Sequence, residues 1–487
     1  YEGAIAAEMP ATVRGSGVPQ VKAIYAVSGS RQRMRMRDAA AKFALSSLMI
    51  GSGASLGREG PTVQICATVA SACGRLFALS PSNQRRLVPV GAAAGIAAAF
   101  NAPIAAVTFV IEELVGSLDT TVLSGVVVAA ALAAVVEHSV LGEHPVFTVP
   151  HEYGLTHASS LLVYAALGVV AGLSAFAFSR GLLQTRGAFQ RMWRVPIALR
   201  PAIGGLVTGF FAALVLVGFQ AQGISGGGYD TIGLALGGQL AAGSMIALFG
   251  AKAIATVFGY ASGGVGGIFA PTLFVGSMLG GLFGYLDQWG LSHADTQIGA
   301  FALVGMGAFF AGVIRAPITS VLIIFEMTGS YRLVLPLMIA NTLAFIVARR
   351  FEHSSIYEAL LEQDGIRLPH RRALAMSSLP VQEAMTKKVL SLQSDSTVNE
   401  ALETIAPTEF ASFPVLSPDG GLVGVITEGR LRRLAAEGEL DTQLAEHAKN
   451  REFLHTGQSL RDALNAMNRL GVRQMVVVHE SDRRTLA

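Results

Sequence analysis

Long apolar segments separated by short polar loops fill most of the chain. They run over residues 39–54, 62–79, 88–115, 122–141, 160–179, 202–219, 231–258, 264–285, 299–328 and 333–349. A helix needs about 20 apolar residues to cross a bilayer. The stretch 231–286 carries Lys252 as its only charged residue. The pattern predicts a polytopic α-helical membrane protein and excludes a single soluble enzyme.

Glycine and proline interrupt many of these segments, so several are too short to be simple spans. Irregular backbone survives at membrane depth only where it is buried in protein or lines a polar cavity. In transporters such broken helices surround a binding site near the middle of the bilayer. We therefore expect the functional residues to lie at the breaks.

The chain also contains an internal repeat. A shift of 214 positions places seven residues on identical ones, namely Gly91, Ala94, Ala102, Pro103, Ile104, Val107 and Glu112. A shift of 210 positions does the same for Gly57, Pro61 and Thr62. Repeats of this kind in transporters are commonly inverted across the membrane plane, so we expect an inverted repeat.

Near residue 380 the pattern changes to short strands and amphipathic helices. We expect a helix over 396–405, strands over 412–416 and 422–426, and the same helix and strand order again over 459–470 and 474–479. The last 107 residues hold 27 of the 69 charged residues, a share typical of a soluble protein. The predicted domains are a transmembrane domain over 1–365, a linker over 366–379, and two copies of a small α/β module over 380–440 and 441–487, the second of them truncated.

Charge and cysteine content exclude further classes. The net charge of +3 is too small to indicate a nucleic-acid partner. Cys66 and Cys73 lie seven residues apart in an apolar segment, so neither a disulfide framework nor a metal site is expected. Arginines cluster at positions 31 to 37 and at 85 and 86, which places these short loops in the cytoplasm.

Three clusters of glycine and proline stand at the starts of apolar helices. They cover 15–19, 57–61 and 266–271 and contain Gly15, Pro19, Gly57, Gly60, Pro61, Gly267 and Pro271. Glycine followed by proline in the first turn is typical of a helix start. A helix N-terminus offers unpaired N–H groups and the positive end of a dipole. Any one cluster could be a packing break, but three together predict an anion site.

Two carboxylates within the apolar segments are candidates for ion chemistry. Glu59 follows Arg58 between glycines, and an ionisable residue inside a span is a functional candidate; the alternative is an ion pair with Arg58. Glu112 and Glu113 end another segment and must point about 100° apart on a helix. Glu112 recurs as Glu326, which favours a structural role. The alternative for Glu113 is a solvated charge at a helix end.

The three clusters, in this order and followed by Tyr357 in the sequence His-Ser-Ser-Ile-Tyr, resemble the CLC family of chloride channels and chloride/proton antiporters. The C-terminal part resembles the paired CBS domains that many CLC proteins carry. The resemblance implies a chloride site made by the hydroxyls of Ser16 and Tyr357 and by backbone N–H groups near Gly17, Ile268 and Phe269. Taken alone, Tyr357 would be read as a tyrosine anchoring the membrane interface.

The resemblance also assigns roles to the carboxylates. It implies that Glu59 is the external gate, which occupies an anion site when deprotonated and leaves with a proton when protonated. It implies that Glu113 transfers protons on the internal side, at a position where channels of the family commonly have an apolar residue. The expected function is therefore chloride/proton exchange rather than an enzymatic activity, through a pore in each subunit. The alternative is a passive chloride channel of the same fold.

The family pattern further implies a homodimer in the lipid of a bacterial inner membrane, with the CBS module in the cytoplasm. Two departures stand out. The chain starts about fifteen residues before the first cluster, so the initial membrane helices of the family are expected to be missing. Arg430 stands where nucleotide-binding CBS modules place an aspartate for the ribose, which argues against adenine nucleotide, and no cofactor is expected.

Two rival functions come from other classes. An intramembrane protease could pair Ser52 with a histidine from another span, but His138, His144, His151 and His157 lie together in one loop region. The tail alone could serve as a soluble sensor module, which a nucleotide titration of the isolated tail would test.

Overall fold

The computed structural model describes residues 13–26, 34–116, 120–142, 146–147, 153–155, 157–293, 295–329, 331–366, 368, 379–387, 389–406, 408, 410–448, 452–472 and 474–479. The chain divides into two compact units, 1–368 and 369–487. The arginines at positions 31 and 33 and most of the predicted linker lie outside the described residues.

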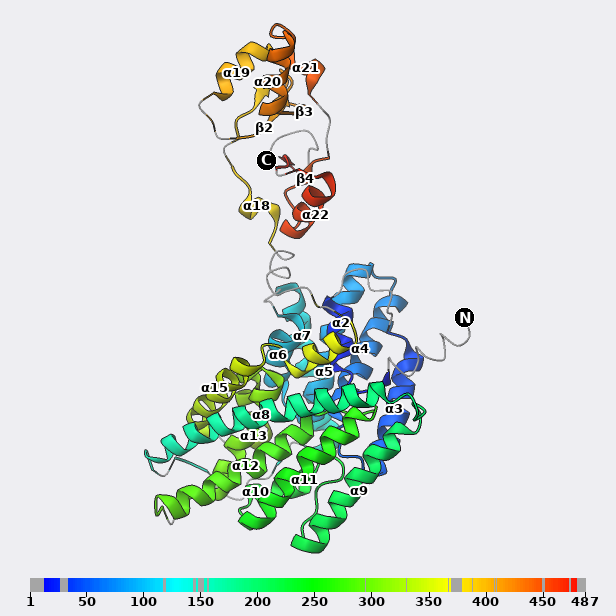
Figure 1. The fold of residues 1–487 in the computed structure, drawn as a ribbon, viewed down its shortest axis with the longest axis vertical. Helices are drawn as coiled ribbons and strands as arrows, with labels where there is room; N and C mark the ends of the chain where they lie inside the picture. Colours follow the sequence, from blue (N-terminus) through cyan, green and yellow to red (C-terminus); the bar gives the residue numbers. More distant parts are fainter. Residues whose placement is uncertain are drawn as a thin grey trace. The chain divides into compact units, whose positions relative to one another are not determined.

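Apart from isolated bridges between single residues, the described secondary structure of the first unit is helical (Figure 1). They are α2 (Val18–Ala26), α3 (Met36–Gly51), α4 (Glu59–Leu76), α5 (Pro81–Phe100), α6 (Pro103–Phe109), the π-helical turn η1 (Val110–Val115), α7 (Thr120–Leu141), α8 (Ser160–Arg191), α9 (Arg200–Phe219), α10 (Tyr229–Leu236), α11 (Ala242–Ala261), α12 (Phe269–Gly290), α13 (Ile298–Ile314), α14 (Pro317–Thr328), the 3-10 turn η2 (Tyr331–Leu333), α15 (Val334–Phe351) and α16 (Ile356–Gln363). Within the described residues, 6 helical segments are long and apolar enough to cross a membrane.

The predicted breaks divide the apolar segments into shorter helices. α5 ends at Asn101 and α13 ends at Arg315, both left-handed at φ 50° and 70°. These two residues are 214 positions apart, and in each half a proline, Pro103 or Pro317, then opens the next helix. The two halves of the repeat therefore share their backbone breaks as well as their residues.

The repeat is inverted, as predicted. Gly57 and Gly267, equivalent positions in the two halves, form an antiparallel bridge in which each N–H donates to the carbonyl of the other, at 2.7 and 2.6 Å. Equivalent residues can pair antiparallel only if a local two-fold axis reverses the direction of one half. This axis places the second and third glycine clusters face to face.

The centre of the unit is formed by α8, α11, α12 and α13, which pack side by side (Figure 1). Every residue of α13 from Gly299 to Ile314 is buried. Glycines allow α12 and α13 to approach closely, since a Cβ on Gly305 would lie 2.7 Å from the backbone nitrogen of Gly280. The N-terminus of α12 is thereby fixed deep inside the protein.

The second unit is the predicted small α/β module. Its elements are α18 (Val381–Ala384), β1 (Leu392–Gln393), α19 (Val398–Ile405), β2 (Ser412–Leu416), β3 (Leu422–Thr427), α20 (Glu428–Glu437), α21 (Leu444–His447), β4 (Leu454–His455), α22 (Leu460–Leu470) and β5 (Val477–Val478). β1 pairs parallel with β2, and β2 antiparallel with β3. β4 pairs parallel with β5, so the order strand, capped helix, parallel strand occurs twice.

Candidate functional site

The three glycine clusters meet at one place in the first unit. The N–H of Gly15 donates to the carbonyl of Gly264 at 3.0 Å, and the N–H of Gly266 donates back to Gly15 at 3.1 Å. The pair of Gly57 and Gly267 joins the second cluster to the third. The N-termini of α2, α4 and α12 therefore converge, as the anion-site hypothesis requires.

Two glycines make this convergence possible. Gly17 has φ +102°, and a Cβ there would lie 2.8 Å from the carbonyl oxygen of Gly60. A Cβ on Gly60 would lie 2.6 Å from the carbonyl oxygen of Ser16. Only glycine fits at these two positions without a shift of the backbone. The start of α4 therefore lies directly against Ser16.

Ser16 and Tyr357 place two free hydroxyl groups in this region. Both side chains are 0 % exposed, and within the described residues neither hydroxyl oxygen has a hydrogen-bond partner. The two side chains are near neighbours. Buried polar atoms in folded proteins nearly always find a partner, so this pair points to a ligand that accepts hydrogen bonds. The complete burial of Tyr357 excludes the reading of an interface anchor.

The start of α12 faces the same region. Ile268 caps this helix and Phe269 is its first residue, so their N–H groups have no intrahelical acceptor. The Phe269 ring packs against Phe100 and Phe310, with ring centroids 4.6 and 4.4 Å apart. The helix N-terminus thus lies in an apolar setting, where its dipole acts on an anion with little screening.

Glu59 is the first residue of α4 and is 1 % exposed. Its Oε1 accepts a hydrogen bond from the Tyr229 hydroxyl, while its Oε2 has no partner among the described residues. Arg58 is exposed and its guanidinium lies over the Tyr229 ring, and no ion pair joins it to Glu59 in the part of the chain that the structure describes. The predicted alternative, a structural ion pair between these neighbours, is therefore wrong.

Glu113 belongs to a second buried group. It lies on η1, is 3 % exposed, and accepts hydrogen bonds at 2.8 Å from both Lys22 Nζ and Ser355 Oγ. Lys22 also donates to Glu358 Oε1 at 2.8 Å. The alternative of a solvated helix-end charge is therefore wrong. Glu112 points elsewhere, towards the N-terminus of α14, which confirms that the adjacent carboxylates face different surroundings.

Sequence reasoning missed the buried lysines. Lys252 Nζ donates to the carbonyls of three residues in the loop before α10 at 2.7 to 2.8 Å. Lys42 Nζ donates to the carbonyls of Val13 and Gly15 at 2.9 and 2.6 Å. Lys42 and Lys252 are 210 positions apart, so the repeat offset combined with the rarity of charge in these segments could have identified them.

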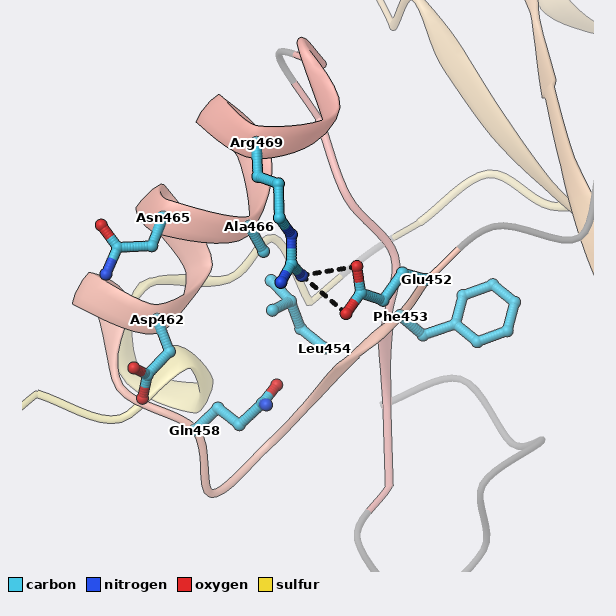
Figure 2. Close-up of a pocket in the computed structure, with 8 residues that line it drawn as sticks. All are labelled: Glu452, Phe453, Leu454, Gln458, Asp462, Asn465, Ala466 and Arg469. Carbon is cyan, nitrogen blue, oxygen red and sulfur yellow. Dashed lines mark hydrogen bonds and ion pairs between the residues drawn. The ribbon is translucent and has the colours of Figure 1, made fainter.

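A cavity of about 330 Å³ lies in the second unit, in a groove beside α22 (Figure 2). Among the described residues that line it, Arg469 is the one cation, and its guanidinium binds both carboxylate oxygens of Glu452 at 2.7 and 2.6 Å. Asp462 adds a further negative charge to the rim. This lining offers little to a phosphate group, and the expectation of no nucleotide stays a prediction.

The protease reading gains no support from the placement of Ser52. Its hydroxyl donates to the Met49 carbonyl at 2.9 Å at the exposed end of α3. No described histidine forms a hydrogen bond with it.

The chain matches two known protein families and is similar to named transporters. Residues 3–349 match the family described as voltage gated chloride channel, and residues 381–437 match the CBS domain. The chain is 34% identical over 371 residues to the H(+)/Cl(-) exchange transporter ClcA of Vibrio cholerae serotype O1 (strain M66-2), with 76% of this chain and 77% of the relative covered. The same name is borne by a Vibrio campbellii protein that is 34% identical over 352 residues, with 72% and 74% covered.

Solved structures resemble the fold as well. A slow cyanobacterial Cl-/H+ antiporter matches with a TM-score of 0.65 and 28% identity, over 72% of this chain and 81% of the other. A eukaryotic CLC transporter matches with a TM-score of 0.61 and 22% identity, over 97% and 83%. Both matches show that the chain shares the fold of CLC transporters. The chain belongs to the voltage gated chloride channel family, the CLC family.

Proposed function

We propose that this protein exchanges chloride for protons across a membrane. The observation that carries the proposal is the pair of buried hydroxyls of Ser16 and Tyr357, which lack hydrogen-bond partners within the described structure and lie beside converging helix N-termini. The names of the relatives, exchange transporter and antiporter, support it.

A halide suits this set of donors. Hydroxyl groups and N–H groups at helix ends donate to an anion without a full positive charge that would trap it. The N–H groups at Ile268 and Phe269 and the hydroxyls of Ser16 and Tyr357 all present hydrogens, which disfavours a cation. Transport requires binding of this moderate strength, because the ion must also leave.

Glu59 is the proposed external gate. Its carboxylate lies at the start of α4, among the helix ends that attract an anion, and so it competes with chloride for the same electrostatic environment. When deprotonated it occupies this place as an anion. When protonated it loses that attraction and leaves, which admits chloride and moves one proton.

Glu113 favours exchange over passive conduction. It is a second buried carboxylate, and its partner Ser355 caps α16, the helix that carries Tyr357. A passive channel has no need of a buried, ion-paired carboxylate at this place. The alternative function, a chloride channel of the same fold, would give no functional reason for a buried carboxylate at Glu113.

Purified protein in liposomes tests the proposal. With an outward chloride gradient and a pH-sensitive dye, we expect chloride-driven proton uptake. Glu59→Gln should mimic the protonated gate, keep chloride flux and lose proton movement, whereas the exposed control Glu403→Gln should behave as the wild type. Proton uptake that persists in Glu59→Gln would remove the gate assignment, and wild-type chloride flux without protons would favour the channel.

The remaining expectations stay predictions. They are pairing of two subunits that each hold a complete pathway, residence in a bacterial inner membrane, a cytoplasmic position of the CBS unit, and a second CBS module over 441–487.

A further inference from the structure

Tyr229 is the described residue whose side chain bonds directly to the Glu59 carboxylate. It is the first residue of α10 and is contributed by the second half of the repeat, 170 positions after Glu59. Its hydroxyl donates to Oε1 and leaves Oε2 without a partner among the described residues. No motif in the sequence marks this tyrosine.

The Tyr229 ring is held on several sides. Phe147 packs against it with ring centroids 5.8 Å apart, and the Arg58 guanidinium lies over it at 5.8 Å from the centroid. A Cβ on Gly227 would lie 2.7 Å from the ring edge, so the absence of a side chain there lets the ring lie against the backbone. The hydroxyl therefore has a fixed direction, towards Glu59.

The loop that precedes Tyr229 is fixed as well. Lys252 is 0 % exposed and its ammonium group binds the carbonyls of Gly223, Ile224 and Gly226 at 2.8, 2.8 and 2.7 Å. A buried ammonium with three acceptors is fully satisfied, and breaking this arrangement would leave an unpaired buried charge. The lysine thus anchors the loop and stays near the gate without bonding to it.

Among the described residues, few titratable groups lie near Glu59. They are Tyr229 from α10, Lys252 from α11, Tyr357 from α16 and the neighbouring Arg58. Within the described structure, the Tyr229 hydroxyl alone donates a hydrogen bond to the carboxylate. The stability of the seated gate therefore depends on that bond more than on any other single contact.

We propose that Tyr229 is a positioning residue that holds the deprotonated Glu59 in its seat and sets the pH at which the gate opens. The inference rests on the proposed gating role of Glu59. A hydrogen bond to a carboxylate is about twice as strong as one to a neutral acid. When a proton adds to Oε2, the bond from Tyr229 weakens while the phenol keeps its own proton, and the side chain is released.

The phenylalanine variant tests this role. Tyr229→Phe keeps the ring between Phe147 and Arg58 and removes only the hydroxyl. Losing a bond to the charged form favours the protonated form, so the midpoint of pH-activated chloride flux should move to higher pH by about one unit, a tenfold change in the protonation equilibrium. Coupled proton movement should remain, because Glu59 is still present.

Two further variants separate the possible outcomes. Tyr285→Phe is the matched control, because it removes a tyrosine hydroxyl that donates to the Leu240 carbonyl at 2.9 Å and does not bond to Glu59. It should leave the midpoint unchanged. In a Glu59→Gln background, Tyr229→Phe should have no effect on the pH profile.

An unchanged midpoint in Tyr229→Phe overturns the inference, as does an equal shift in the control or a shift that persists without Glu59. None of these results would contradict the proposed gating role of Glu59. Proton coupling that survives in Glu59→Gln alone would instead contradict the proposed function, so the two failures are distinguishable.

Discussion

Glu112 and Glu326 each bind the N-terminus of a helix in the opposite half of the repeat. The Glu112 carboxylate accepts the first N–H groups of α14 at 3.2 and 2.8 Å, and the Glu326 carboxylate accepts those of α6 at 3.0 and 2.7 Å. These two reciprocal contacts are related by the same local two-fold axis as the bridge between Gly57 and Gly267. Equivalent glutamates thus fasten the two halves to each other, which confirms the structural role expected for Glu112.

Removing either glutamate should destabilise the membrane unit. Glu112→Ala and Glu326→Ala each leave two N–H groups, one exposed and one half-buried, without their carboxylate acceptor. Each also removes the negative charge that stabilises the helix dipole. We expect a loss of about 1–2 kcal/mol for each, by analogy with lost helix caps. Thermal unfolding in detergent measures it, with the exposed Glu403→Ala as control. A melting temperature as in the wild type for both variants would contradict the fastening role.

Glu113→Gln should uncouple chloride transport from proton transport. The amide cannot carry a proton, while the chloride donors Ser16 and Tyr357 are unchanged. Chloride flux into liposomes should therefore persist and chloride-driven proton uptake should fall to the level of Glu59→Gln. Full proton coupling in this variant would show that protons take a route that does not use Glu113.

The hydroxyls of Ser16 and Tyr357 should affect binding and stability in opposite directions. Each hydrogen bond to an anion contributes about 1.5–3 kcal/mol, so Ser16→Ala with Tyr357→Phe should weaken chloride binding by at least tenfold in calorimetry. Without chloride both groups are buried and unpaired, which is itself unfavourable. In chloride-free buffer the double variant should therefore be at least as stable as the wild type.

Unchanged chloride affinity in that double variant would place the site elsewhere. Tyr285→Phe again serves as the control, because its hydroxyl lies outside the proposed site.

Lys22 should be energetically coupled to Glu113. Lys22→Met leaves the buried carboxylate without its cation, which typically costs about 3–5 kcal/mol. Adding Glu113→Gln removes the uncompensated charge and should restore a large part of the loss. A double-mutant cycle on thermal unfolding measures the coupling. Strictly additive effects would mean that the ion pair contributes little.

Much of the fold could be predicted from the sequence because its signals are local. Glycine and proline fix helix starts through backbone geometry, so the starts of α2, α4 and α12 lie within the three clusters. The repeat was readable from Gly91 to Glu112 and their counterparts. Its inversion needed the antiparallel pair of Gly57 and Gly267, which no linear pattern reveals.

The rest of the site depends on contacts between distant parts of the chain. Lys22 meets Glu113 across 91 positions, and Tyr229 meets Glu59 across 170. Lys22 lies in the short helix α2, where nothing in the sequence marks it as the partner of Glu113, and Tyr229 follows glycines that are typical of a turn. Periodicity reports which face of a helix is buried, but it does not report which buried groups become partners.

The π-helical turn η1 marks a difference in length between the two halves of the repeat. Gly116, which ends η1, lies 13 positions after Pro103, whereas Gly329, which ends α14, lies 12 positions after Pro317. A π turn is how a helix absorbs one inserted residue without losing its ends. The additional residue of the first half lies between Glu112 and Gly116, in the turn that carries the buried Glu113. Glu112 and Glu326 keep equivalent places in the two halves, and the backbone register of the first half changes by one residue only after Glu112, beside Glu113.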